Sequence, residues 1–216
     1  VSLALAARVG PDGEVLAFDP QRLVFQAFCA AVALNGLTQV RAWHAAVGAR
    51  PGRVRMPLVD PRKAFNFGAA RVAGDGAAGP GEDVPLLTLD SLALPSCHLL
   101  KIDVEGMDFD VLLGGEDLIR RCRPAIYMEA KQGPRTRDAI AWLLERDYLC
   151  HWHFAAFYSA DNFNGVRENV FGHRGDINLL ALPAEKPARA RLPAIAGPEA
   201  DWRRDYEAFL KPGDAG

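Results

Sequence analysis

The stretch LLKIDVEGMDFDVLLGG, residues 99–115, carries charged side chains at the end of an apolar segment. Its first residues are typical of a buried β-strand, and Lys101, Asp103 and Glu105 occupy alternate positions. Because the side chains of a strand alternate between two faces, these three lean to the same face. A buried charge must be paired with an opposite charge or take part in a functional site. The stretch therefore predicts a polar site at the carboxyl end of a strand.

The segments around this stretch alternate between short apolar runs and runs with helical spacing. Strands that alternate with helices indicate an α/β fold with right-handed crossovers and a mostly parallel sheet covered on both faces. The last two strands have no helix between them and are expected to pair antiparallel. The Gly-, Arg- and Pro-rich segment up to about residue 83 is expected to be irregular or to hold a hairpin. Strands are expected at residues 13–18, 39–48, 98–104, 125–130, 149–158 and 177–183, and helices at 1–9, 20–34, 109–122 and 136–147.

The composition describes one globular domain without a marked electrostatic preference. The 216 residues are 50% hydrophobic and 24% charged, with a formal net charge of −2. This charge gives no electrostatic case for nucleic acid or an anionic membrane as a partner. No apolar run approaches the roughly 20 residues that span a bilayer, and no signal-peptide pattern opens the chain. The four cysteines form no CxxC pair and are expected to be reduced thiols in the cytoplasm.

Three acidic residues end three different expected strands. Asp19 follows the first strand, Asp103 follows the sequence LLKI, and Glu129 follows AIYM. Open α/β sheets bind ligands outside the carboxyl ends of their strands, so the three acids are expected along one rim. This convergence predicts a ligand site.

Asp19 has two interpretations. An Asp before a proline and a helix is a good N-cap. An acid that ends the second strand of a nucleotide-binding fold can instead accept hydrogen bonds from two ribose hydroxyls. The strand-then-helix setting favours the ligand role, without distinguishing one ribose-containing cofactor from another.

The charges of the opening stretch also have two interpretations. Lys101 and the two carboxylates can form a solvated salt-bridge cluster, which would contribute little to stability. Alternatively, the carboxylates lie near a reacting hydroxyl, where they remove its proton or hold a divalent cation that lowers its pKa. We favour the second interpretation, because Asp103 is expected at the buried rim.

Two further features are candidates for a site. His151 and His153 share a strand face, as two metal ligands can, but no third ligand follows at a familiar spacing, so packing is preferred. The Asn- and Gly-rich loop 161–169 fits either a substrate lid or an ordinary surface loop. Candidate pocket walls, equally suited to loop packing, are Phe65, Asn66, Phe67, Asn162, Phe163 and Asn164.

Five segments together resemble the FkbM-type methyltransferases, which use S-adenosylmethionine. They are VGPDGEVLAFDPQ, NGLTQVRAWHAAVG, VPLLTLDSL, LLKIDVEGMDFDVLLGG and RPAIYMEA, in the order and spacing of the family. KIDVEG is the most specific of these motifs. The resemblance implies a methyltransferase domain over residues 1–183 with a Rossmann-like class I fold, leaving residues 184–216 as a linker-like tail in which DWRRDYEAFL has the character of a short helix.

The resemblance also implies a cofactor pocket. Asp19 stands where the family usually has glutamate, and it would contact the ribose. Pro20 and Gln21 would border the same pocket. Ala46 and Val47 lie about where the adenine ring is expected.

For the chemistry, the resemblance implies an acidic site. Asp103 and Glu105 match the family's acidic pair, close to the methyl donor and the acceptor. By looser similarity to cation-dependent O-methyltransferases such as catechol O-methyltransferase, Asp103 and Glu129 occupy strand ends where metal ligands occur. A divalent metal therefore stays open beside a role for these acids as bases on their own.

One departure from the family concerns the beginning of the chain. The family's first strand and its glycine-rich turn, which cradles the methionine end of the cofactor, should lie just before Val1. We expect the chain to be part of a longer enzyme, with weakened cofactor binding where that turn is missing.

The resulting hypothesis is an S-adenosylmethionine-dependent O-methyltransferase that acts on a small-molecule, glycan or natural-product hydroxyl, with the oligomeric state left open. One alternative is a nicotinamide-dependent oxidoreductase, which calls for a Tyr-x-x-x-Lys pair. Tyr127 and Lys131 have that spacing, but on a strand and its following loop rather than on a helix. The other alternative is a non-catalytic domain that kept the fold.

Overall fold

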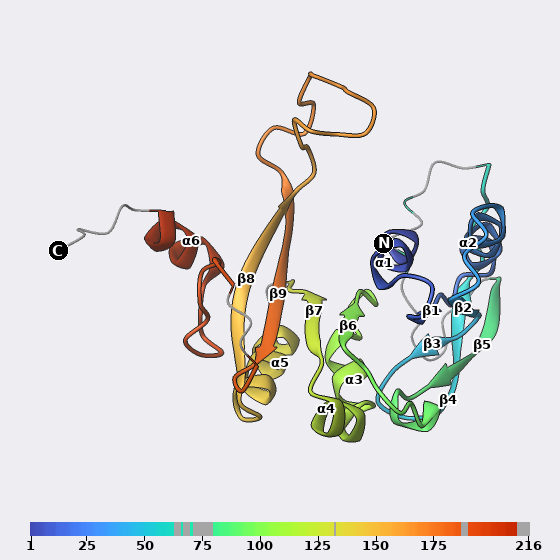
Figure 1. Ribbon diagram of the computed structural model, residues 1–216, viewed down its shortest axis with the longest axis horizontal. Helices are drawn as coiled ribbons and strands as arrows, with labels where there is room; N and C mark the ends of the chain where they lie inside the picture. Colours follow the sequence, from blue (N-terminus) through green and yellow to red (C-terminus); the bar gives the residue numbers. More distant parts are fainter. Residues whose placement is uncertain (63–65, 67–69, 71–79, 132, 187–189, 211–216) are drawn as a thin grey trace. The chain divides into compact units, whose positions relative to one another are not determined.

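The computed structural model describes residues 1–62, 66, 70, 80–131, 133–186 and 190–210 (Figure 1). The chain divides into two compact units. The first consists of Val1–Ala93 with Leu113–Gly115, and the second of Leu94–Leu112 with Glu116–Gly216. In the described ranges, no helix has both the length and the apolar character needed to cross a membrane.

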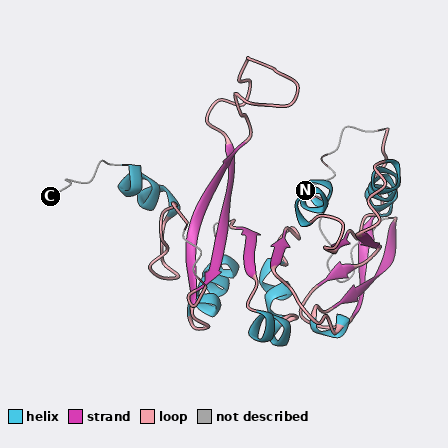
Figure 2. Ribbon diagram, viewed as in Figure 1, coloured by secondary structure: helices cyan, strands magenta, loops and turns pink. Residues whose placement is uncertain are grey.

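The first unit contains a parallel strand pair and a three-stranded mixed sheet (Figure 2). β1 pairs parallel with β2, while β5 pairs parallel with β3 and antiparallel with β4. β4 lies within the segment expected to be irregular or to hold a hairpin, whereas β5 extends past its expected end at about residue 83. The elements are α1 (Ser2–Val9), β1 (Val15–Phe18), α2 (Arg22–Leu34), β2 (Val40–Trp43), β3 (Ala46–Val47), β4 (Gly52–Pro57), β5 (Gly81–Leu87) and the 3₁₀ turn η2 (Asp90–Leu92).

A small apolar core joins the helices and strands of this unit. Ala6 of α1, Val15 of β1 and Val40 of β2 are buried together, and Phe28 and Val32 of α2 pack against them. The helical spacing of the apolar residues predicts α2 itself, but only part of its core-facing side, because Leu23 and Leu34 at the same spacing are exposed. The helix ends as expected at Asn35-Gly36, where Gly36 has a φ of 62°.

The strand expected over residues 39–48 is divided into two. β2 ends at Trp43 and β3 begins at Ala46, and the two belong to different sheets. Between them the chain bends at His44, whose Nε2 lies 3.1 Å from the Pro20 carbonyl oxygen. This contact between distant residues, which local alternation does not reveal, interrupts the strand.

The second unit is built on a four-stranded sheet in the order β6-β7-β9-β8 (Figure 2). β6 and β7 are parallel, and β9 runs antiparallel to both of its neighbours. The expected antiparallel pairing of the last two strands is confirmed. The elements are β6 (Leu99–Ile102), α3 (Asp108–Leu113), α4 (Glu116–Cys122), β7 (Ala125–Glu129), α5 (Pro134–Leu144), β8 (Tyr148–Ala156), β9 (Gly175–Pro183) and α6 (Trp202–Leu210).

The two faces of this sheet differ in polarity. By strand alternation and register, one face carries residues that are nearly all buried and apolar, among them Ile126, Met128, Cys150, Leu179 and Ala181. α5, which packs against β8, buries Ala139, Ile140 and Leu143. The opposite face carries polar side chains at successive register positions: Lys101, Tyr127, Glu129, His151, His153 and Asn178. The candidate site lies along this polar face.

The helix expected over residues 109–122 is interrupted at two glycines. α3 ends at Leu113 and α4 begins at Glu116. A Cβ on Gly114 would lie 2.0 Å from the Gly48 carbonyl oxygen, and one on Gly115 would lie 2.8 Å from Leu89 Cδ1. Close packing, in addition to the weak helix propensity of glycine, therefore requires the double glycine.

The C-terminal segment is bonded to the outer edge of β8. Trp152 N–H donates to the Pro193 carbonyl (2.9 Å), and Ile195 N–H donates to the Cys150 carbonyl (2.8 Å). Within α6, the helix expected in this tail, the Tyr206 hydroxyl accepts from Phe154 N–H at 2.6 Å. The tail thus satisfies backbone groups of an edge strand.

Candidate functional site

The acidic turn after β6 has a strained backbone. The strand ends at Ile102, and Glu105 follows with a φ of 44°, next to Gly106 with a φ of 95°. A non-glycine residue in the left-handed region costs about 1 to 2 kcal/mol. Such strain persists where the surroundings hold the residue in place, which is common at functional sites.

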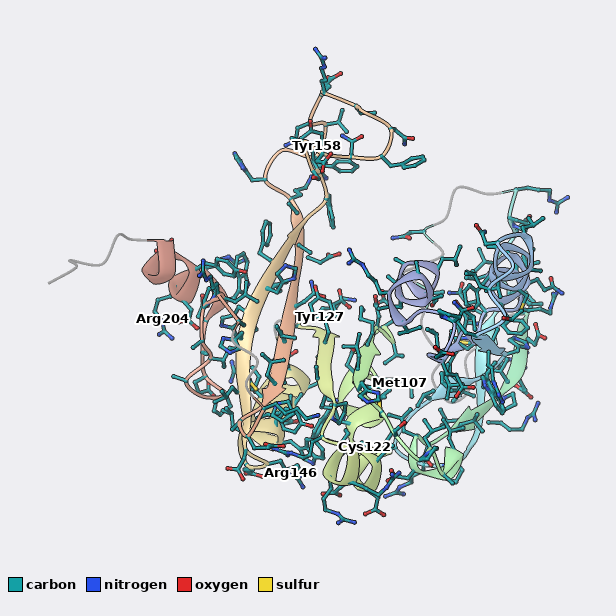
Figure 3. The ribbon with its side chains drawn as sticks, in the orientation of Figure 1. Met107, Cys122, Tyr127, Arg146, Tyr158 and Arg204 are labelled. Atoms are coloured by element: carbon teal, nitrogen blue, oxygen red, sulfur yellow. The ribbon has the colours of Figure 1, made fainter. Side chains whose placement is uncertain are left out.

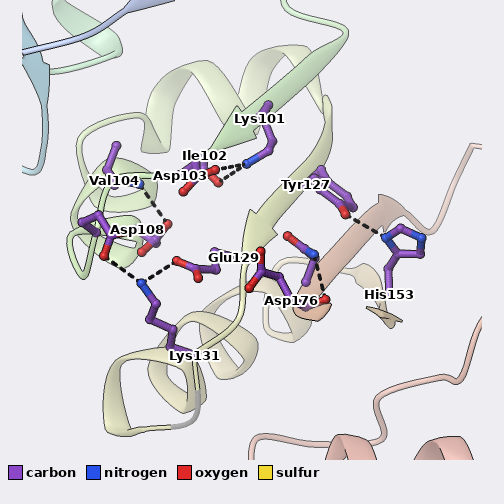
Figure 4. Close-up of polar contacts among 12 residues, drawn as sticks. Lys101, Ile102, Asp103, Val104, Asp108, Tyr127, Glu129, Lys131, His153 and Asp176 are labelled. Carbon is purple, nitrogen blue, oxygen red and sulfur yellow. Dashed lines mark hydrogen bonds and ion pairs between the residues drawn. The ribbon is translucent and has the colours of Figure 1, made fainter. Parts of the chain in front are cut away.

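Lys131 bonds the Glu105 carboxylate. Figure 4 shows the same ammonium paired with Glu129. Lys131 Nζ lies 2.8 Å from Glu105 Oε2 and 2.9 Å from Glu129 Oε2, so one ammonium bridges two carboxylates. The side chains of Glu105 and Glu129 are only 17% and 16% exposed. The end of β7 and the turn after β6 are therefore joined by a half-buried ion-pair network.

Lys101 pairs with the third acid. Its Nζ lies 3.0 Å from Asp103 Oδ2 and 3.1 Å from the Ile102 carbonyl oxygen. The side chain of Asp103 is 60% exposed, so the expectation of a buried Asp103 is wrong. Lying beyond the last residue of β6, this carboxylate reaches solvent rather than the sheet face.

Burial and neighbouring charges shift the pKa values of the cluster. Burial raises the pKa of Glu129, the bonds to Lys131 oppose this, and the charges of Asp103 and Glu105 raise it further. Burial by itself would lower the pKa of Lys131. The bonds to Glu105 and Glu129 outweigh this effect and raise the pKa. Lys131 therefore stays an ammonium at neutral pH, whereas Glu129 binds a proton more readily than a free glutamate.

Asp108 is a further acid of this region that the sequence did not single out. It is the first residue of α3, and its Oδ1 accepts from Val104 N–H at 3.5 Å (Figure 4). Burial raises the pKa of its carboxyl, and backbone hydrogen bonds oppose the rise. It stabilises the turn that carries Glu105.

Tyr127 and His153 form a polar pair on the same sheet face. The Tyr127 hydroxyl lies 2.7 Å from His153 Nδ1, and Lys101 Nζ lies 5.6 Å from the centre of the Tyr127 ring. The Tyr-Lys pair of an oxidoreductase is not formed, because Tyr127 bonds His153 and Lys131 bonds carboxylates. Among the described residues, no group of three His, Cys, Asp or Glu side chains could hold a metal, which leaves a metal role of His151 and His153 without support.

Asp19 lies in the first unit, at the end of β1. Its Oδ1 accepts from Gln21 N–H at 2.8 Å, while Gln21 itself is the N-cap of α2. Asp19 therefore closes a turn before the helix and does not cap it. Burial raises the pKa of its carboxyl, opposed by the Gln21 N–H and by His44.

A hollow of about 350 Å³ lies beside this turn. Pro20 and Gln21 are among its walls, and the ion pair of Arg22 with Glu82 (2.9 Å) lies at its border. Its other walls are mostly apolar: Leu23, Val24, Met56, Pro57, Leu58, Val59 and Pro61.

Ala46 and Val47, the expected adenine neighbours, do not line this hollow. They are buried and pair with Leu86 and Leu87 of β5. His44, two residues before Ala46, contacts Pro20 in the turn after β1.

The candidate pocket walls in loops are placed differently. Phe65 and Phe67 lie outside the described residues, and Asn66 is exposed. Asn162 organises its own loop, because its Oδ1 accepts from Val166 N–H at 3.0 Å and its Nδ2 donates to the Val166 carbonyl at 2.7 Å.

This loop, which joins β8 to β9, is held by its own hydrogen bonds. The Tyr158 hydroxyl donates to the Arg167 carbonyl at 2.9 Å, and Figure 3 shows Tyr158 within the loop. Phe163 is fully exposed, and Asn164 is exposed as well. The choice between a lid and a surface loop therefore stays a prediction.

Parallel strands that end in acids define an α/β domain suited to hold a ligand beyond its strand ends. Residues 1–150 match the family model of the methyltransferase FkbM domain, and the chain belongs to this family. A crystal structure of methyltransferase FkbM from Methylobacillus flagellatus KT is similar to this chain, with 14% identity and a TM-score of 0.49. The match covers 82% of this chain and 40% of that protein. No curated protein matches the sequence.

Proposed function

We propose that this chain is an S-adenosylmethionine-dependent O-methyltransferase domain acting in the cytoplasm on a small-molecule, glycan or natural-product hydroxyl. The match of residues 1–150 to the FkbM methyltransferase domain carries the proposal. The cytoplasmic part of the proposal draws on the four cysteines, which are all free thiols, as is usual in a reducing compartment.

The residues around Asp19 fit the cofactor. One oxygen of this half-buried carboxylate accepts from Gln21 N–H, and a carboxylate has lone pairs on both oxygens for ribose hydroxyls. The adjoining hollow, bordered by Pro20 and Gln21, offers apolar walls for a nucleoside. Ala46 and Val47 stay part of the proposal as neighbours of the adenine ring.

The acidic residues fit the acceptor chemistry. Bound S-adenosylmethionine would supply a methyl group on a positively charged sulfur. The acceptor oxygen attacks that carbon in line, so a group of the protein must orient the hydroxyl and take its proton. Glu129, which is half-buried and has a raised pKa, is suited to accept the hydroxyl proton. Asp103 and Glu105 lie on the turn beside it.

Transfer of a radiolabelled methyl group tests this function. The protein is incubated with S-adenosylmethionine labelled in the methyl group and with pools of phenols, sugars and hydroxy acids. Label is expected in at least one pool, and Glu129→Gln should lower the rate by about 100-fold, the usual range for loss of a general base. Glu199→Gln, on an exposed residue paired with Arg137, is the matched control and should keep the rate. A folded protein that labels no pool and binds NADH instead would contradict the proposal.

A further inference from the structure

The acids of the candidate site have the ligand chemistry of a divalent cation site. Asp103 and Glu105 follow β6, Glu129 ends β7, and carboxylate oxygens are the ligands that Mg²⁺ and Ca²⁺ prefer. β6 and β7 are parallel, with Ile102 opposite Met128. Asp103 and Glu129, which follow these two residues, therefore occupy the next position in the register.

The positive charge between these carboxylates is already supplied by the chain. Lys131 Nζ lies within 2.9 Å of both Glu105 Oε2 and Glu129 Oε2, and Lys101 Nζ lies 3.0 Å from Asp103 Oδ2. Two ammonium groups thus pair with three carboxylates. A divalent cation would have to displace Lys131 and overcome its repulsion, so the residues present do not fit a metal.

The backbone places the Lys131 ammonium near the carboxylates of Glu105 and Glu129. Lys131 follows Glu129 by two residues, which brings both side chains to the same side of the chain. Glu105 is held at a φ of 44°, an unfavourable conformation that turns its carboxylate toward the ammonium. The Lys131 side chain is 46% exposed, so a molecule from solvent can reach it.

We propose that Lys131 is the cation of the acceptor site and that methyl transfer here uses no divalent metal. This inference rests on the proposed function for its chemistry. The ammonium has three N–H donors, two of which bond the carboxylates, and the third donates to the acceptor hydroxyl oxygen. The oxygen–methyl bond forms as the carbon–sulfur bond breaks, and the hydroxyl proton passes to Glu129. The sulfur leaves as a neutral thioether.

The acid-base properties agree with these roles. Lys131 has a raised pKa and stays charged, so it can stabilise developing negative charge on the acceptor oxygen. Glu129 also has a raised pKa, so it holds a proton better than an exposed carboxylate does. Removing the ammonium would leave Glu105 and Glu129 repelling each other and open to a cation.

Manganese binding tests the inference without cofactor or acceptor. Electron paramagnetic resonance follows free Mn²⁺ as it is titrated into the protein. Wild type is expected to show no saturable site up to millimolar Mn²⁺, whereas Lys131→Met should gain a site at least tenfold tighter. Adding Glu129→Gln to Lys131→Met should abolish it. Lys101→Met, which removes the neighbouring ammonium that bridges no carboxylates, is the matched control and should gain none.

Two further variants keep the result interpretable. Lys131→Arg keeps the charge and should bind no Mn²⁺, and circular dichroism shows whether each variant is folded. If Lys131→Met does not fold, Lys131→Gln takes its place in the titration. A saturable Mn²⁺ site in wild type that Glu129→Gln removes would overturn the inference, as would the absence of any gain in folded lysine variants. Failure of the proposed function would appear elsewhere, as a lack of cofactor binding or methyl transfer.

Discussion

Replacing Gly114 by alanine should destabilise the protein strongly, because the added Cβ has no room. It would lie 2.0 Å from the Gly48 carbonyl oxygen, 3.0 Å from the Gly48 carbonyl carbon and 3.3 Å from Ala49 Cα. All three are backbone atoms, which cannot rotate away as a flexible side chain can. One of the two chain segments must therefore move by more than about 1 Å to reach normal van der Waals contact.

Hydrogen bonds hold both segments in place. Gly48 N–H donates to the Leu87 carbonyl at 2.9 Å, and the Gly114 carbonyl accepts from Asp90 N–H at 3.0 Å. Overpacking costs about 1 to 3 kcal/mol, and losing one of these bonds adds about 1 kcal/mol. The lower entropy of alanine in the unfolded chain returns about 0.4 to 1 kcal/mol. The free energy of unfolding should fall by about 1 to 3.6 kcal/mol.

Urea unfolding followed by tryptophan fluorescence measures this loss. With a slope of about 2 kcal/mol per molar urea, the midpoint should fall by about 0.5 to 1.8 M. Gly52→Ala is the matched control, because a Cβ at Gly52 would meet nothing within 4 Å. Equal midpoints for the two variants would refute the argument that close backbone packing requires Gly114.

Four other substitutions have defined outcomes. Tyr206→Phe removes the hydroxyl that bonds the backbone of β8 and should cost about 1 to 2 kcal/mol in urea unfolding. Tyr158→Phe, whose hydroxyl bonds loop carbonyls, should change little, and equal losses would contradict this. Hydrogen bonds from Arg123 lower the pKa of Glu185 to about 2 from 4.5. The part of the stability lost in Arg123→Met that comes from this pair should therefore be fully present above about pH 4.5 and disappear toward pH 2. The loss of the bonds to the Arg146 and Asp147 carbonyls should remain at low pH, and a wholly pH-independent difference would be inconsistent. Glu105→Gly removes an ion pair but relieves a positive φ, so thermal unfolding should show a net change below about 1 kcal/mol, and a loss above about 2 would argue against strain at this turn.

Local sequence patterns predicted most of the secondary structure. The apolar run before Asp19 is β1, the helical spacing after it is α2, and the segment LLKI is β6. These elements are determined by periodicity and by the residues at their ends, which are local properties. The antiparallel β8–β9 pair followed from the lack of a helix between the two strands.

Contacts between distant segments account for what the sequence did not reveal. β2 and β3 separate at His44, which reaches the carbonyl of Pro20. Tyr127 meets His153 across β9, which lies between β7 and β8, and local patterns do not contain this strand order. The burial of Asp103 was overestimated, because this residue lies beyond the strand end.

The bridging role of Lys131 was within reach of the sequence. Its position two residues after Glu129 places both side chains on one side of the chain, as period-two alternation indicates. The partner in the turn, Glu105, is recognised only once its left-handed backbone conformation is known. The sequence therefore predicted the acids of the site, and the structure adds the cation that pairs them.

Calorimetric titration of S-adenosylhomocysteine into the protein tests the central claim most directly. Wild type is expected to bind at submillimolar concentration. Asp19→Ala loses hydrogen bonds of a carboxylate, worth about 1.5 to 3 kcal/mol, and should bind at least 10-fold more weakly. Asp12→Ala, on an exposed turn residue, should bind as wild type does. A folded protein that does not bind S-adenosylhomocysteine at millimolar concentration, or an Asp19→Ala variant that binds it as tightly as wild type, would contradict the account.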